Sequence, residues 1–315
     1  MAGKDPAMGG SRLNGILVID KPVDISSAGV VAIVKRTLQV KKVGHAGTLD
    51  PFAEGVLVCC VNRATRLARF LLHGPKKYVA VLKLGEETDT QDATGTVISR
   101  SRPAGCTPDT LKKVMQSFEG SGKQLPPVYS ALKHKGVALY KLARRGQPVQ
   151  KPARRIQIYR MTIRGIDLPF VHFEVWCSAG TYIRTLCADI GKILGCGGHL
   201  SALKRIASSG FDIEQAIALT DLPAVAQSRK LSERMISMAD ALPDMPAVTA
   251  DASLVTKIRH GRPVFFNDLA GARDAGDSPL TGGKIKIVDY RGQLVAILSR
   301  SRANDRLDYN CVFAD

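Results

Sequence analysis

The chain has 315 residues, and its 45 Lys and Arg residues outnumber its 28 Asp and Glu residues, which gives a formal net charge of +17 at pH 7. This length suits about two domains, each able to bury a core without disulfides or metals. The charge favours a polyanionic partner, and nucleic acid fits better than a membrane because the sequence contains no apolar run of about 18 residues.

The chain is predicted to start with a disordered tail, residues 1–12, which lacks the apolar stretch of a signal peptide. A short buried strand over residues 15–19 follows and leads into Asp20-Lys21-Pro22. A helix is predicted to begin near Ser27. Its apolar face would be formed by Val30, Ile33, Val34 and Leu38.

The segment Gly44-His45-Ala46-Gly47-Thr48-Leu49-Asp50-Pro51 holds one carboxylate in a loop that begins with glycines and ends with proline. Both glycines permit a positive φ or a close backbone approach, and Pro51 biases Asp50 towards an extended conformation. An Asp-Pro pair often only caps a turn. Here a buried strand over residues 56–61 follows, and then a helical pattern with Arg63, Arg66 and Arg69 on its outer face. We therefore expect Asp50 to be a fixed functional acid.

Residues 77–84 alternate as a strand, 85–94 form an acidic loop and 96–99 are extended again, so 77–84 and 96–99 are expected to be neighbouring strands. A helix is predicted after the N-cap Thr107 and is expected to end at Gly120. Its apolar positions are Leu111, Val114, Met115 and Phe118. Two prolines keep residues 125–131 out of a helix, and a short basic helix is predicted around 137–145.

Residues 154–163 and 170–177 alternate with period two and are predicted to form a β-hairpin. An amphipathic helix of about four turns is predicted from Thr181. Two shorter helices are expected before and after Phe211.

The seven cysteines do not indicate disulfides, because their number is odd and Cys59 and Cys60 are adjacent in a predicted strand. This usage fits a reducing, cytoplasmic location. The residues Cys177, Cys187, Cys196 and His199 lack a Cys-x-x-Cys pair, so we expect no metal site. Cys187 fits better as a core residue of the helix.

Pro243 and Pro246 mark a predicted domain boundary. Beyond it, strands over 284–288 and 294–298 are separated by a turn at Arg291-Gly292, and residues 270–283 form a small-residue loop. The predicted organisation is a tail (1–12), a main domain (13–245) and a small β-rich domain (246–315).

Five segments, in order, resemble the bacterial tRNA pseudouridine synthases of the TruB type. They are Asp20-Lys21-Pro22 with Ser27, residues 44–57, Lys76-Lys77-Tyr78, residues 126–133 and residues 177–186. The chain departs from the family at Asp24 and Ser26, where glycine and threonine are usual, and at Ala179, where a basic residue is common. The resemblance implies an α+β fold. A catalytic domain would be built on a mixed, largely antiparallel sheet flanked by helices, and a PUA-like C-terminal domain would strengthen RNA binding.

The resemblance also implies the reaction, which is the isomerisation of a T-loop uridine of tRNA (uridine 55) to pseudouridine without a cofactor. Asp50 would be the nucleophile, and attack at C1′ of the ribose, attack at C6 of the base and a glycal route all stay open. Arg184 would hold the carboxylate charged through a bidentate contact, although spacing alone favours a solvent-facing arginine. Tyr78 would stack on the flipped uridine, the alternative being a half-buried strand residue.

Four further residues are implied in substrate binding. His45 would fill the gap left by the flipped base, Lys21 would position Asp50 or a phosphate, and Asp92 and Tyr182 would contact the nucleotide. About half of the following basic residues are expected to touch phosphate. They are Lys35, Arg36, Lys41, Lys42, Arg63, Arg66, Lys133, Lys135, Arg144 and Arg145.

The expected partner is the T-arm of tRNA, bound by a monomer without another protein. An RNA-binding or RNA-folding protein, in which Asp50 is only a structural turn, is the main alternative. A nucleosidase is a third possibility, and the cationic surface speaks against it because that reaction needs no RNA-sized contact.

Overall fold

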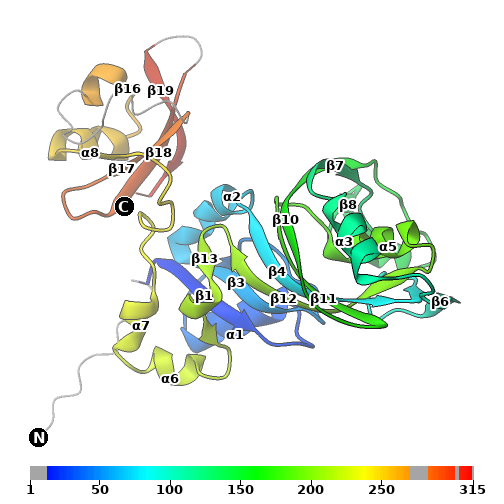
Figure 1. Cartoon of the computed structure of the whole chain (residues 1–315). Coiled ribbons are helices and arrows are strands. Elements are labelled where there is room, and N and C mark those ends of the chain that lie inside the picture. Colours follow the sequence, from blue (N-terminus) through cyan, green and yellow to red (C-terminus); the bar gives the residue numbers. More distant parts are fainter. Residues whose placement is uncertain (1–12, 270–282, 302–304, 314–315) are drawn as a thin grey trace, which may run out of the picture.

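The computed structural model describes residues 13–269, 283–301 and 305–313. The predicted tail and all but the last residue of the small-residue loop over 270–283 lie outside the described residues. The described chain forms a larger α+β part and a smaller β-rich domain, which Figure 1 shows in orange and red. The predicted fold class is confirmed.

The larger part is built on one sheet of ten strands. Among its described strands, most neighbours are antiparallel, while β1 pairs with β14 and β3 with β12 in parallel. β2 (Val43–His45) pairs with β3, and β13 (Phe211–Asp212) pairs with β12. The main path runs through β14 (Ile217–Ala218), β1 (Gly15–Lys21), β3 (Glu54–Val61), β12 (Gly198–Ser208), β4 (Lys76–Leu84), β11 (Phe170–Cys177), β10 (Arg154–Asp167) and β7 (Gly120–Gln124).

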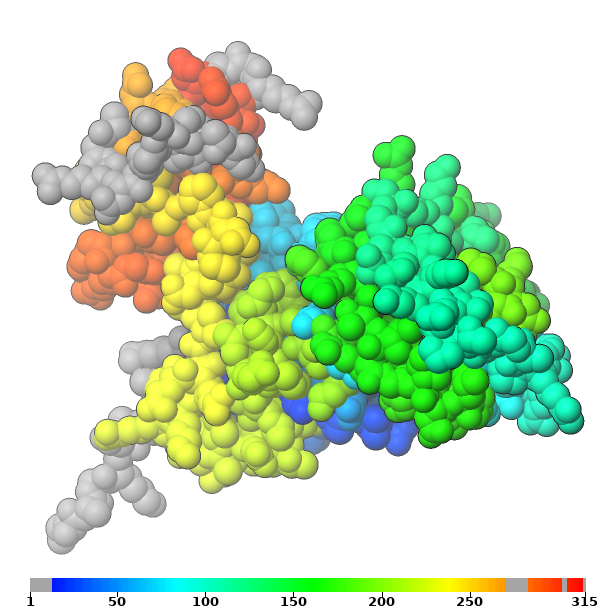
Figure 2. Space-filling view, in the orientation of Figure 1, coloured from blue at the N-terminus to red at the C-terminus, as the bar shows by residue number. Residues whose placement is uncertain are grey.

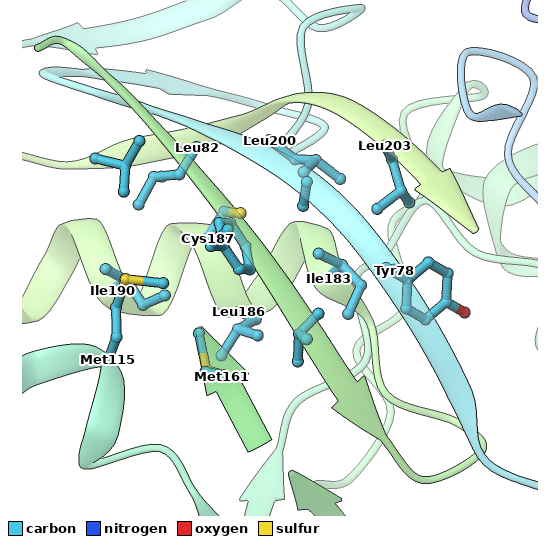
Figure 3. Packing of buried hydrophobic residues seen from close by; sticks show 14 of the residues in the cluster. Tyr78, Leu82, Met115, Met161, Ile183, Leu186, Cys187, Ile190, Leu200 and Leu203 are labelled. Carbon is cyan, nitrogen blue, oxygen red and sulfur yellow. The ribbon is translucent and has the colours of Figure 1, made fainter. Parts of the chain in front are cut away.

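Helices cover the sheet in two groups. α5 (Ile183–Ile193) and α3 (Pro108–Gln116) pack on β4, β10, β11 and β12, and Figure 3 shows α5 inserting Leu186, Cys187 and Ile190 into this core. The prediction that Cys187 is a core residue is confirmed, since none of its surface is exposed. α1 (Ser27–Thr37) and α6 (Leu222–Ala226) pack on β1 and β3 in a second cluster.

The remaining elements of the larger part are short. They are a 3₁₀-helix (Asn62–Leu67) continued by α2 (Ala68–Leu71), α4 (Leu139–Ala143), a 3₁₀-helix (Ile213–Gln215), α7 (Lys230–Arg234), and the two hairpins β5 (Glu86–Thr88) with β6 (Val97–Arg100) and β8 (Lys133–His134) with β9 (Val137–Ala138).

The C-terminal domain has a five-stranded sheet that packs against the larger part. The elements are β15 (Ala247–Thr249), α8 (Ala252–Arg259), β16 (Val264–Phe265), a 3₁₀-helix (Phe266–Leu269), β17 (Lys284–Val288), β18 (Leu294–Arg300) and β19 (Arg306–Val312). Leu294, Ile297 and Phe313 share an apolar cluster with Leu67 and Leu71 of the larger part. The two parts are therefore joined by a buried apolar contact.

Three arginines reinforce this contact. Arg63 and Arg66 were expected on an RNA face, but the structure uses them differently. With Arg69, they donate hydrogen bonds to the main-chain oxygens of Phe313, Val312 and Asn310, respectively. Their spacing of three residues places all three guanidinium groups on one side of the helical segment, facing the end of the chain.

The prediction of a short helix before Phe211 is wrong, because residues 198–208 form the central strand β12. Two bulges interrupt its pairing with β4, between Leu200 and Ala202 and between Arg205 and Ala207. Each bulge inserts an extra residue and breaks the period-two pattern of a strand. Leu200 and Leu203 are consequently buried at a spacing of three, which imitates a helix. After Phe211, a three-residue 3₁₀-helix (Ile213–Gln215) comes first and the short helices α6 and α7 follow, so short helices after Phe211 are confirmed.

Two smaller predictions also fail. β6 pairs with β5 and not with β4, because β11 and β12 occupy both edges of β4. The helix α3 ends at Gln116, and Gly120, at φ +100°, starts β7. The predicted hairpin over 154–177 and the helix beginning at Ser27 are confirmed.

Candidate active site

The Asp50 loop joins β2 to β3, and its backbone requires two glycines. Gly47 lies at φ +116° and Gly55 at φ +101°. A Cβ at Gly55 would lie 2.2 Å from the main-chain oxygen of Arg205, so no larger residue fits there. The expected positive φ is thus found at Gly47, whereas Gly44 lies in β2 and has no positive φ.

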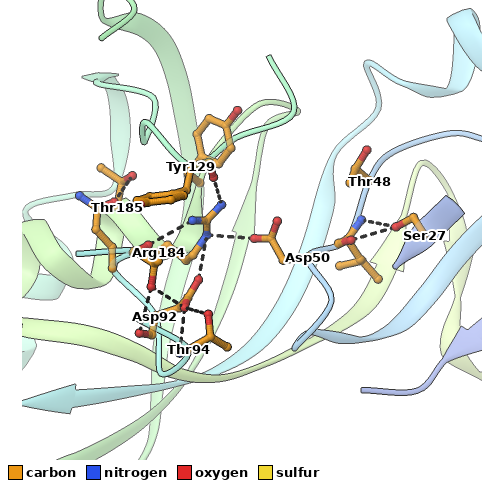
Figure 4. Close-up of polar contacts among 12 residues, drawn as sticks. Ser27, Thr48, Asp50, Asp92, Thr94, Tyr129, Arg184 and Thr185 are labelled. Atoms are coloured by element: carbon orange, nitrogen blue, oxygen red, sulfur yellow. Dashed lines mark hydrogen bonds and ion pairs between the residues drawn. The ribbon is translucent and has the colours of Figure 1, made fainter. Parts of the chain in front are cut away.

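Three side chains brace the loop from its two sides. The Ser27 hydroxyl donates to the oxygen of Leu49 at 2.9 Å and accepts from its nitrogen at 2.8 Å, as Figure 4 shows. Lys21 Nζ donates to the oxygens of Pro51 at 3.0 Å and Ala53 at 2.6 Å. These contacts hold the backbone directly before and after Asp50.

The third brace is Arg205 of β12. Its Nε donates to Val56 O at 2.8 Å, while Nη1 and Nη2 donate to Thr48 O and Gly47 O at 3.3 and 3.0 Å. Only 1% of Arg205 is exposed. A guanidinium that bridges both ends of the loop fixes where the loop sits on the sheet.

Lys21 was expected to position either Asp50 or a phosphate. The structure fits the first role, because the lysine is completely buried and its ammonium group is bound to carbonyl oxygens. Burial lowers the pKa of Lys21 to about 8, against an opposing effect of Asp24 and Asp50.

Arg184 lies at the start of α5 and is 3% exposed, which excludes the solvent-facing alternative. Its Nε forms an ion pair with Asp50 Oδ2 at 2.9 Å. The expected bidentate contact is wrong, because Nη1 donates to Thr90 O and Nη2 to Tyr129 O (Figure 4). The arginine is thus held by the protein on one side and meets Asp50 with the other.

Asp92 is a second anion beside the same guanidinium. Its Oδ2 lies 3.6 Å from Arg184 Nε, and its Oδ1 accepts hydrogen bonds from Thr90 Oγ1, Thr94 N and Thr94 Oγ1. Only 4% of Asp92 is exposed. In this structure Asp92 supports Arg184 and does not line the cavity in which Asp50 lies.

That cavity has a volume of about 560 Å³ and brings together four of the predicted site residues, Asp50, Tyr78, Tyr182 and Arg184. Its volume lies within the range usual for small-ligand sites. His45 and Lys21 do not line it. His45 Nδ1 is buried without a hydrogen-bond partner among the described residues.

Two opposing effects act on the charge of Asp50. Burial raises the pKa of Asp50 above its ordinary value of 3.8, the Arg184 charge lowers it, and the charge of Asp92 raises it again. The side chain is still 37% exposed to the cavity. An ionised carboxylate at this position is accessible and depends on Arg184 for its charge.

Among the residues that line the cavity, sequence reasoning missed three cations as site residues: Lys76, Arg154 and Arg205. The Arg154 guanidinium lies over the ring of Tyr182, 4.5 Å from its centroid. Arg205 was hidden because its segment was expected to be helical. Its burial could have been predicted only from the period-two pattern of a strand, and the two bulges of β12 interrupt that pattern.

Comparison with known proteins decides the family. Residues 35–183 match the N-terminal domain of the TruB family pseudouridylate synthases, and residues 184–242 match the tRNA pseudouridylate synthase B C-terminal domain. The chain belongs to the TruB family of pseudouridylate synthases. It is therefore an isomerase, and the family resemblance drawn from the sequence is confirmed.

Curated relatives agree with this assignment. The chain is 43% identical to tRNA pseudouridine synthase B of Syntrophotalea carbinolica, over 93% of this chain and 94% of the relative. It is 42% identical to the protein of the same name from Geobacter sulfurreducens, over 84% and 87% of the two chains.

Solved structures share the fold. A chain of a Cbf5-Nop10-Gar1 complex superimposes with a TM-score of 0.72 at 28% identity, covering 95% of this chain and 84% of the other. A chain of an H/ACA RNP bound to a substrate RNA containing 2′-deoxyuridine gives 0.72 at 26% identity, over 100% and 92%. No helix in the described parts of the chain is long and apolar enough to cross a membrane.

Proposed function

We propose that this TruB-family enzyme converts uridine 55 in the T-loop of tRNA to pseudouridine, with Asp50 as the nucleophile. The observation that carries the proposal is a single accessible carboxylate, held on a braced loop and paired with a buried arginine at 2.9 Å. The relatives named tRNA pseudouridine synthase B support tRNA as the substrate.

The reaction breaks the bond between N1 and C1′, turns the uracil and forms a bond between C5 and C1′, after which the C5 hydrogen leaves as a proton. Asp50 can start it by attacking C1′, by adding to C6, or by removing a proton from C2′ on a glycal route. All three routes need Asp50 ionised, so Arg184 has the same role in each of them. Its two carbonyl contacts keep the guanidinium in place while the carboxylate reacts.

The target uridine must leave the stacked T-loop to reach Asp50. Flipping a base costs a few kcal/mol, and stacking on an aromatic ring returns about 1–3 kcal/mol. Tyr78 lines the cavity with Asp50, and 8% of it is exposed, so its ring is available from the cavity side only. We assign Tyr78 to the uracil, Tyr182 to the cavity wall beside it, and His45 to the gap left in the T-loop.

The T-arm would be bound by surface cations and by the C-terminal domain, residues 246–315. Apart from Arg63 and Arg66, which bind the end of the chain, the basic residues predicted for this role are all exposed: Lys35, Arg36, Lys41, Lys42, Lys133, Lys135, Arg144 and Arg145. The C-terminal domain would add phosphate contacts without taking part in the chemistry. The proposal takes the enzyme to act as a monomer in the cytoplasm, where tRNA is found.

Mapping of pseudouridine in an unmodified tRNA transcript tests the proposal. The enzyme should modify uridine 55 alone, and a transcript with cytidine at that position should remain unmodified. Binding without modification of any uridine would instead favour the RNA-binding alternative.

A further inference from the structure

The large sheet has a second face that the proposed chemistry does not use. Successive residues of a strand point to opposite faces, so Lys77 and Tyr78 of β4 lie on different sides. On the Lys77 side, Trp176 of β11 is 46% exposed. It lies between Arg160 of β10 and Lys77 of β4 in the pairing of the three strands.

A cavity of about 530 Å³ opens on this face. Its walls include Lys77, Arg160, Thr162, Arg164, Glu174 and Trp176. The ring of Tyr159, which is 44% exposed, lies beside that of Trp176, with centroids 4.8 Å apart and an angle of 44° between the planes. Trp176 thus lines a space that is large enough for a nucleotide, and Tyr159 extends the exposed aromatic surface beside it.

The charge of this face is net positive. Glu174 is the one carboxylate among the described residues that line the cavity. Its side chain forms ion pairs with Lys77 at 2.7 Å and with Arg164 at 2.9 Å. Arg160 forms no ion pair with any residue that the structure describes, so its charge is available to a ligand.

We propose that this face is a second RNA-contact site, where an unpaired base stacks on Trp176 and the adjoining phosphate binds Arg160 and Lys77. Sheet faces that carry exposed aromatic rings are an established means of binding unpaired bases, and cations beside the rings supply the phosphate contacts. The inference takes RNA as the partner, as the proposed function does, but it concerns a separate surface.

Trp176 is the only tryptophan of the chain, so its fluorescence reports this face selectively. The full-length protein is titrated with a single-stranded hexamer of adenylate, which contains no uridine and cannot be isomerised. We expect a saturable quench of the emission. Arg160→Ala and Lys77→Ala should each weaken binding about tenfold, since each removes one phosphate contact. Arg234→Ala, at an exposed arginine of α7, is the matched control and should leave binding unchanged.

The stacking contact is tested with a labelled hexamer by fluorescence anisotropy. Trp176→Phe should retain binding within about threefold, whereas Trp176→Ala should weaken it about tenfold. Absence of a saturable quench would overturn the proposal. So would an equal loss of binding in Arg184→Met, which would place the hexamer in the Asp50 cavity.

Failure here is separable from failure of the proposed function. Arg160→Ala should convert a T-arm stem-loop at the wild-type rate, because Arg160 does not line the Asp50 cavity. If the wild-type enzyme converted no uridine, the proposed function would fail. The tryptophan titration would still show whether the second face binds RNA.

Discussion

At the level of single residues, the reactivity of Asp50 depends on groups that act on its charge in opposite directions. Burial raises its pKa, while the Arg184 guanidinium lowers it. In the proposed mechanism the carboxylate must be ionised to react, so activity should be lost as the pH falls through the pKa that Asp50 has in the folded enzyme. The acid limb of the rate profile should therefore lie above the ordinary Asp value of 3.8.

Replacing Arg184 with a neutral residue tests this dependence. In Arg184→Met the burial effect loses its main opposing charge and only the smaller effect of Lys21 is left, so the pKa of Asp50 rises further and the acid limb moves to higher pH. Arg184→Lys restores a positive charge and should move the limb part of the way back. The measurement is kcat/KM as a function of pH for the three proteins, and an acid limb that stays in place in Arg184→Met would contradict the account.

Asp24 shows how the chain tolerates a departure from its family. The residue lies at φ +62°, a left-handed conformation in which glycine is usual and Asp is one of the better-tolerated alternatives. Ser26, the other departure in this motif, accepts a hydrogen bond from Gly29 N and caps α1. The turn before α1 is therefore preserved without glycine or threonine.

The stability of two variants at this position follows from that conformation. Asp24→Gly should stay within about 0.5 kcal/mol of the wild type, because relief of the left-handed strain is offset by the greater freedom of the unfolded chain. Asp24→Ala should cost about 1 kcal/mol, since alanine has the strain without a polar side chain to compensate. Urea unfolding measures both, and an alanine variant more stable than the glycine variant would refute this explanation.

At the level of elements, the site depends on the pairing of β12 with β3, the strand that follows the Asp50 loop. Arg205 reaches from β12 to the oxygens of Gly47, Thr48 and Val56. Lysine offers one donor group in place of the planar fork of arginine, so it cannot bridge the loop in the same way. A shift of about 1 Å at a reacting group can cost about 100-fold in rate.

Arg205→Lys should therefore lower kcat about 100-fold with little change in KM, while the variant still binds tRNA. The lysine keeps the positive charge in the core, and a thermal melt confirms that the variant is folded at the assay temperature. A parallel loss of tRNA binding, or an unchanged kcat, would show that Arg205 does not position the loop.

Most elements could be predicted from the sequence, because their patterns are local. The spacing of Val30, Val34 and Leu38 predicted α1, and the alternation over 154–177 predicted the hairpin of β10 and β11. β12 could not be predicted in this way, since its bulges depend on pairing with β4, a strand more than a hundred residues earlier.

The site was predictable to a similar degree. The motifs identified Asp50, Tyr78, Tyr182 and Arg184, which the fold brings to one cavity. The single contact between Arg184 and Asp50 was not predictable, because the carbonyl groups of Thr90 and Tyr129 come from distant loops.

At the level of the whole molecule, the C-terminal domain is attached by apolar packing and by the arginines of the segment 62–71. A domain held in this way would present the RNA-binding surface that we propose for it at a fixed distance from Asp50. On the proposed function, full-length tRNA would contact both parts, whereas a short T-arm stem-loop would be bound by the larger part alone.

Weakening this attachment should reduce binding of full-length tRNA more than conversion of the stem-loop. Arg63→Ala combined with Arg69→Ala removes two of the three hydrogen bonds to the end of the chain. The variant should lose affinity for full-length tRNA by about tenfold and become more sensitive to proteolysis near residue 245, with little change in conversion of the stem-loop. Filter binding and limited proteolysis measure these effects, and equal losses on both substrates would argue against a separate contribution of the domain.

The central claim is that the Asp50 carboxylate starts the isomerisation and is not needed for RNA binding. Release of tritium from tRNA labelled at C5 of uridine measures the reaction directly, because that hydrogen leaves only when the new bond has formed. The wild-type enzyme should release one equivalent per tRNA, and Asp50→Asn should release none while it binds the same tRNA with similar affinity. Tritium release by Asp50→Asn at the wild-type rate would contradict the account.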